Sequence, residues 1–149
     1  MNIARDSYGA TIDGLVPRSF LPEKIADLGR LDVKIKPGSF VEGGVIARNI
    51  KCLETPFSII GPVLATGSIE ADSKNEGGIF RGPVTATKSV RLTSQSTDSS
   101  MSIVGDLAAD QITLKNCIVY GNVITREAHL ENVIVMGSIY GEKSLNLNN

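Results

Sequence analysis

The sequence predicts an all-β fold, a parallel β-helix (β-solenoid) of about six coils, and three observations lead to this prediction. Glycine recurs six times in one sequence context. Apolar residues recur at a spacing of two inside short segments, which is the period of a β-strand. The chain of 149 residues has no Trp and only 5% aromatic residues. We therefore expect a narrow core in which Val, Ile, Leu and Ala stack in columns.

Each copy of the repeat is organised around a glycine. Two residues later comes an aliphatic residue and four later a small one, mostly alanine. The intervals are 18, 21, 23, 16 and 16 residues, and the glycines are Gly43, Gly61, Gly82, Gly105, Gly121 and Gly137. Sixteen residues are too few for paired helices or a propeller blade but suit one solenoid coil of about three short strands. We interpret the small residues as a corner, and the glycine as a bend or a φ that a side chain would resist.

Two polar inserts, residues 72–78 and 94–100, explain the longer intervals. Both follow the same apolar column of the repeat, so we expect both to protrude from one side of the rod. Such loops commonly vary freely at the surface, and the other interpretation is an edge that binds a partner.

Residues 1–38 lack the repeat, and we expect them to form a cap or packing segment before a β-solenoid domain at 39–147. Residues 22–28 can form one or two helical turns, which Gly29 would end. The segment carries Ile12, Val33 and Ile35 among many other apolar residues, too many for a free tail. A solenoid needs such a cap because an open end is an exposed β edge.

Composition excludes several classes of protein. The net charge of −1 argues against nucleic-acid binding, which needs a basic surface. No apolar run of about 18 residues is present, so we expect no transmembrane helix. The N-terminus lacks the pattern of a secretory signal, which predicts a cytoplasmic protein. In that compartment Cys52 and Cys117 are expected to be reduced and buried.

The sequence shows no catalytic constellation. His129 is the single histidine, and it lies between the inward positions Ala128 and Leu130, so alternation points it to solvent. One histidine and two distant cysteines cannot form a zinc site. Phosphate-binding glycine loops are missing. We therefore expect a protein that is not an enzyme and has no catalytic residues, cofactor or metal.

Two alternatives stay open. Residues 60–65 and 66–71 are two six-residue units that suit a left-handed β-helix, the fold of hexapeptide acyltransferases with a histidine base; the six-residue register is lost after Ala71. The second alternative is a small protein-binding module that uses loops 72–78 and 94–100.

Apolar side chains are predicted on the outside of the last coils. In residues 117–120 and 133–136 apolar and polar residues do not alternate. If Val119 and Val135 point inward, their neighbours point outward and form a contact surface. The expected lateral interface is Ile118, Tyr120, Ile134 and Met136. In earlier coils the same outer apolar surface would continue through Ile60, Ile79 and Val104. The alternative is that residues 3–35 fold back and cover this surface. The expected end-coil interface is Leu145 and Leu147, on an open strand edge.

The motifs Gly61-Pro-Val-Leu-Ala65, Gly82-Pro-Val-Thr-Ala86, Gly105-Asp-Leu-Ala-Ala109 and Gly121-Asn-Val-Ile-Thr125, each followed by a short apolar strand, resemble those of bactofilins. These are polymer-forming bacterial cytoskeletal proteins. The resemblance covers residues 39–147. It implies a right-handed β-helix that polymerises end to end without nucleotide and recruits envelope or cell-shape factors, often at the inner face of the membrane. The expected function is thus a self-assembling scaffold whose partners are its own copies and envelope-associated proteins.

Overall fold

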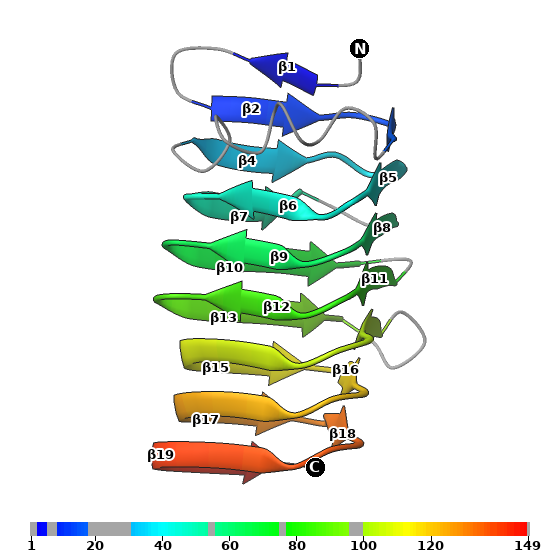
Figure 1. The fold of residues 1–149 in the computed structure, drawn as a ribbon. Coiled ribbons are helices and arrows are strands. Elements are labelled where there is room, and N and C mark those ends of the chain that lie inside the picture. Colours follow the sequence, from blue (N-terminus) through cyan, green and yellow to red (C-terminus); the bar gives the residue numbers. More distant parts are fainter. Residues whose placement is uncertain are drawn as a thin grey trace.

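The computed structural model describes residues 3–5, 9–17, 31–53, 56–74, 77–95 and 100–148. These residues form an all-β parallel β-solenoid of about six turns (Figure 1). The prediction of the fold class is confirmed. Among the described ranges, no helix is long and apolar enough to cross a membrane.

Six complete turns, from residue 39 to residue 148, cross three faces in chain order, and two more strands of face 1 and one of face 2 precede them. Face 1 consists of β2 (Gly9–Ile12), β4 (Asp32–Ile35), β7 (Asn49–Cys52), β10 (Ser68–Ser73), β13 (Ser89–Ser94) and the second parts of β15 (Leu107–Lys115), β17 (Val123–Glu131) and β19 (Ile139–Asn148). Face 2 is the sheet of β3 (Leu15–Val16), β5 (Ser39–Glu42), β8 (Phe57–Ile60), β11 (Gly78–Arg81), β14 (Met101–Ile103), β16 (Cys117–Val119) and β18 (Ile134–Val135). Face 3 consists of β6 (Val45–Ala47), β9 (Val63–Ala65), β12 (Val84–Ala86) and the first parts of β15, β17 and β19.

The strand register confirms the columns that the repeat predicts. On face 3, Val63 pairs with Val84, which pairs with Leu107. On face 1 one column passes through the turns as Ile12, Ile35, Cys52, Ala71, Leu92, Leu114, Leu130 and Leu147. All its members except Leu147 are buried. The core accommodates the aromatic pair Phe57–Phe80, whose ring centroids lie 5.1 Å apart.

The glycine column lies where the backbones of successive turns touch, between faces 2 and 3. A Cβ on Gly121 would lie 2.5 Å from the carbonyl oxygen of Gly105, and one on Gly137 would lie 2.5 Å from that of Gly121. Gly61 also has a positive φ of 121°. A bend with a positive φ, as the sequence predicts, accounts for glycine at Gly61. At Gly121 the reason is different, because the backbone of the neighbouring turn leaves no room for a Cβ.

Parallel pairing begins before the repeat does. β2 pairs in parallel with β4, and β3 with β5, so part of the segment expected to cap the solenoid supplies strands to faces 1 and 2. These strands carry inward apolar residues such as Ala10 and Ile12, which are buried. They lack the glycine of the repeat, and for this reason the repeat does not reveal them. β1 (Ile3–Arg5) pairs with β2 and is antiparallel to it. The helical turns predicted at 22–28 lie outside the described residues.

The two inserts leave the solenoid at the same corner. One connects β10 to β11 and the other connects β13 to β14, each from face 1 to face 2. The ends of β10 and β13 are paired, with Ser73 opposite Ser94. Both inserts therefore begin at the same corner, while the prediction that they protrude from one side of the rod concerns loops that lie partly outside the described residues.

Candidate functional site

The last turn leaves its inward residues uncovered. β19 pairs with β17 on one side, and no other described strand pairs with its second edge. Leu145 is 41% exposed and Leu147 57% exposed, whereas Ala128 and Leu130, their counterparts one turn earlier, are 5% and 4% exposed. Both leucines occupy core positions of the repeat, and β19, which carries them, is the last strand of the stack in Figure 1. Among the described residues, the second edge of β19 is thus unpaired and carries exposed apolar side chains.

Face 2 carries apolar side chains on its outer surface in the last turns. Val119 is buried, while Tyr120 is 51%, Ile134 56% and Met136 65% exposed. Ile118 is half-buried and pairs with Ile134 in register. Side chains in residues 117–120 and 133–136 therefore point alternately inward and outward as predicted, with apolar residues on both sides.

Earlier turns contribute to face 2 less uniformly. Ile60 and Ile79 are half-buried and Val104 is exposed. Ile60 pairs with Arg81, so the outer surface there mixes apolar and charged groups. β2, β3 and β4, which include most of the described residues of 3–35, pair into the ladder at the N-terminal end instead of lying over β16 and β18.

Sequence reasoning predicted the outward position of Tyr140, which is confirmed, but missed that Tyr140 belongs to a second outer column, on face 3. Its members lie three residues after each glycine and pair in register from turn to turn: Ile46, Leu64, Thr85, Ala108, Ile124 and Tyr140. Leu64 is 41%, Ile124 46% and Tyr140 58% exposed. The signal was present in the repeat, since this position is apolar in all copies but one. Leu15 and Phe40 on face 2 are also exposed.

Face 1 is polar on its outer surface. One outer column passes through Lys34, Lys51, Glu70, Arg91, Thr113, His129 and Asn146. His129 is exposed here, as alternation predicts. Ion pairs at the edge of this face, such as that of Arg126 with Asp110 at 3.2 Å, are exposed and contribute less than about 1 kcal/mol each.

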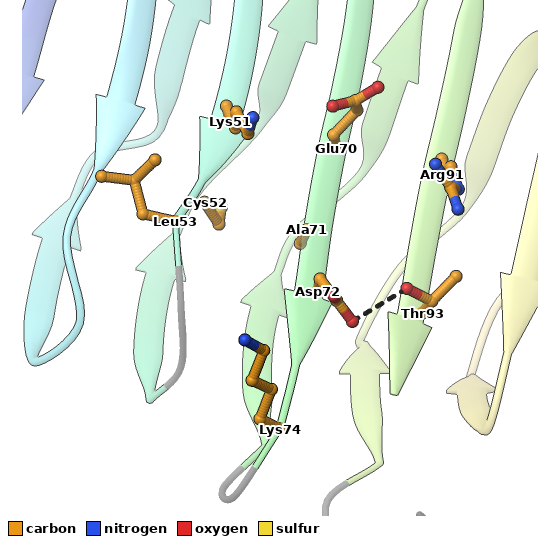
Figure 2. Close-up of a pocket in the computed structure, with 9 residues that line it drawn as sticks. All are labelled: Lys51, Cys52, Leu53, Glu70, Ala71, Asp72, Lys74, Arg91 and Thr93. Carbon is orange, nitrogen blue, oxygen red and sulfur yellow. Dashed lines mark hydrogen bonds between the residues drawn. The ribbon is translucent and has the colours of Figure 1, made fainter. Parts of the chain in front are cut away.

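An open groove of about 270 Å³ lies on face 1 at the base of the 72–78 insert. Figure 2 shows Lys51, Glu70 and Arg91 on neighbouring strands, and Lys74 within the insert. The hydroxyl of Thr93 donates a hydrogen bond of 3.1 Å to Oδ1 of Asp72. Acidic and basic groups alternate in this groove, so it has no strong preference for one sign of charge.

The cysteines do not contribute a nucleophile to any surface. Cys52 and Cys117 are free thiols in the core, and burial raises the pKa of each to about 12. A thiol with this pKa is protonated at neutral pH. Within the part of the chain that the structure describes, no three His, Cys, Asp or Glu side chains cluster as a metal site would require.

No family model, no curated protein sequence and no solved structure matches the chain. The β-solenoid fold follows from the strand pairing alone. The resemblance to bactofilins and the right-handed winding that it implies stay predictions.

Proposed function

We propose that this protein is a structural scaffold that assembles with copies of itself and carries out no catalysis. The observation that supports this proposal most directly is the open edge at β19, where Leu145 and Leu147 occupy core positions but are 41% and 57% exposed. A strand edge with unpaired backbone groups pairs readily with another chain. Pairing there would also bury the two leucines against a second apolar end.

The energy available at this edge is moderate. Fully burying a leucine contributes about 1.5–3 kcal/mol. Because Leu145 and Leu147 are each about half exposed, covering both contributes about as much as burying one whole leucine, roughly 1.5–3 kcal/mol per copy. Backbone hydrogen bonds along β19 add to this, while the lost freedom of the two chains opposes it. Association of this kind depends on protein concentration.

The outer apolar columns provide a second contact surface. Ile118, Tyr120, Ile134 and Met136 on face 2 are proposed to form a lateral interface between rods or with recruited proteins. The resemblance to bactofilins supports a cytoplasmic scaffold, at the inner face of the membrane, that recruits envelope or cell-shape factors. Bactofilin-like filaments and smaller oligomers are both compatible with these two surfaces.

Light scattering and electron microscopy of the 149-residue chain over a range of concentrations test the proposal. We expect the mass to rise with concentration. Leu145→Lys should weaken the apparent affinity of self-association at least tenfold, because a charge would be buried at the joint. The far-UV circular dichroism spectrum of this variant should be unchanged. His129→Lys, on the outer surface one turn earlier, is the matched control and should assemble normally. A single-chain mass at every concentration would contradict the proposal.

The lateral surface is tested separately with Ile134→Lys. We expect this change to remove side-by-side association in micrographs while end-to-end contacts persist. Unchanged bundles would exclude face 2 as the lateral interface.

The groove beside the 72–78 insert favours a second candidate, a protein-binding module. Shortening both inserts should then abolish binding of a partner and leave self-assembly intact. Binding that survives the shortened inserts would exclude them as the partner's site.

A further inference from the structure

We propose that the outer surface of face 1 binds a helix of a partner protein whose charged side chains follow the order acidic, basic, acidic along the rod. The charges that this helix meets are Lys51 on β7, Glu70 on β10 and Arg91 on β13. This inference rests on the second candidate function given above, the protein-binding module, and specifies the partner. Self-assembly of the chain does not depend on it.

The three charges form a row across neighbouring strands. Lys51 pairs in register with Glu70, and Glu70 with Arg91, so successive charges lie about 4.8 Å apart along the rod. All three are exposed, and Figure 2 shows them side by side. Lys34, opposite Lys51, continues the row on one side, and the neutral Thr113, opposite Arg91, ends it on the other. The row therefore has a fixed order of signs: positive, positive, negative, positive.

These charges are not used in salt bridges within the chain. Among the described residues, the salt bridges do not include Lys51, Glu70 or Arg91, whereas Arg126 is held by Asp110 at 3.2 Å. Attraction between exposed charges on neighbouring strands is weak. A partner with matching charges therefore displaces little when it binds, and it strengthens the new pairs by excluding water from them.

The groove beside the row supplies an apolar contact as well. Leu53 follows β7, lines the groove and is 37% exposed. Lys74, in the 72–78 insert, lines it too. The groove is open and its volume is about 270 Å³, so it accommodates side chains of a partner's surface and does not enclose a small molecule. A partner can thus place an apolar side chain on Leu53 next to its charged ones.

The spacing of the row selects a helix. Residues three and four apart in a helix are about 4.5 Å and 6 Å apart along its axis, which brackets the spacing of about 4.8 Å between turns. Residues on one side of an extended strand are about 6.6 Å apart, and the mismatch grows with every turn. The row from Lys34 to Arg91 spans about 14 Å, which is the length of about ten helical residues.

The order of signs selects the partner more than the net charge does. Glu70 repels a segment that is acidic throughout, and Lys51 and Arg91 repel one that is basic throughout. A segment with acidic, basic and acidic residues at intervals of three or four meets an opposite charge at each position. Lys34 favours a further acidic residue beyond the first, which makes the required pattern directional.

A display library tests the inference. The library is built on the outer face of a stable helical hairpin, because a short isolated helix does not hold its structure in water. Three positions at intervals of three or four residues are varied among acidic, basic and neutral side chains, and binders are selected on the 149-residue chain. We expect the order acidic, basic, acidic to be enriched about tenfold over other orders of the same composition.

Charge reversals on face 1 provide the second readout. Glu70→Lys should weaken the selected hairpin about tenfold, and an acidic residue at the hairpin's central position should restore binding. Arg91→Glu should weaken the same hairpin. Arg81→Glu, at an exposed arginine on face 2, is the matched control and should bind as the unchanged chain does. Equal far-UV circular dichroism spectra check that all variants are folded.

The outcomes separate this inference from the candidate function on which it rests. No enrichment of the predicted order, or enrichment of the same hairpins by the unchanged chain and by Glu70→Lys, would overturn the helix-binding row. A partner whose binding is lost when both inserts are shortened, but survives Glu70→Lys and Arg91→Glu, would also overturn the row and leave the protein-binding module intact.

Discussion

Replacing Gly121 by alanine tests the physical basis of the repeat. The added Cβ would lie 2.5 Å from the carbonyl oxygen of Gly105 and 2.6 Å from its carbonyl carbon. Ordinary contact begins at 3.4 Å, so the two turns must separate locally by about 0.9 Å. The obstacle is backbone on a neighbouring turn, which cannot rotate away as a side chain can.

The cost follows from what that separation breaks. The amide of Gly121 donates to the carbonyl oxygen of Gly105 at 3.1 Å, and the amide of Asn122 donates to Oδ1 of Asp106 at 2.8 Å. Losing one such bond costs about 1 kcal/mol, and overpacking costs about 1–3 kcal/mol. We expect Gly121→Ala to lower the free energy of unfolding by about 3 kcal/mol.

Two further glycines serve as controls. Gly38 has a positive φ of 82°, and a Cβ there would have no atom within 4 Å. Gly38→Ala therefore isolates the backbone cost, about 1–2 kcal/mol. Gly137→Ala meets the same 2.5 Å contact but lies in the last turn, which can move outward, so its effect should be smaller than that of Gly121→Ala.

Urea unfolding followed by far-UV circular dichroism measures these effects as shifts of the midpoint. The expected order of destabilisation is Gly121→Ala first, followed by the two controls. A wild-type midpoint for Gly121→Ala, with a lowered midpoint for Gly38→Ala, would refute the conclusion that contact between turns dictates the glycine column.

Two further predictions concern the buried thiols and Asn132, a non-glycine residue with a positive φ that follows the last residue of β17. Cys52 and Cys117 should not react with a thiol reagent in the folded state and should react after unfolding. Burial raises the pKa values of these thiols from 9.0 to about 12, so between pH 9 and pH 12 they ionise in the unfolded chain but not in the folded chain. The free energy of unfolding therefore falls as the pH rises, by about 1 kcal/mol per thiol for each pH unit above 9. Replacing both by alanine should flatten that fall. Asn132 has a φ of 52°, and its side-chain amide donates a hydrogen bond of 2.6 Å to Oδ1 of Asn116. In urea unfolding, Asn132→Ala should cost about 2 kcal/mol, and Asn132→Gly, which adopts this φ freely, about 1 kcal/mol. Equal losses for the two variants would show that φ has no effect.

The inward columns could be predicted from the sequence because they depend on local alternation. Val63, Val84 and Leu107 occupy equivalent places in successive repeats, and stacking identical turns places equivalent residues side by side. The outward position of Tyr120 and Met136 follows from the same alternation. The column through Leu64 and Ile124 follows the same rule and was overlooked, although it is equally local.

The ends of the rod depended on tertiary structure. Ile12 and Leu147 are both apolar residues of one column, and nothing in their local sequence distinguishes 0% from 57% exposure. Exposure at an end is decided by what lies beyond the last turn, which is a matter of three-dimensional packing.

The sequence by itself therefore determined that this chain is a β-solenoid, which side chains point inward, and that glycine is needed at one corner. Among the described residues, tertiary structure alone decided that parallel pairing starts at Gly9, that β1 pairs antiparallel with the first strand of face 1, and that Leu145 and Leu147 are exposed on the last strand. The physical reason is that side-chain direction within a strand is a local property with a period of two residues, whereas burial depends on contacts between segments far apart in the chain.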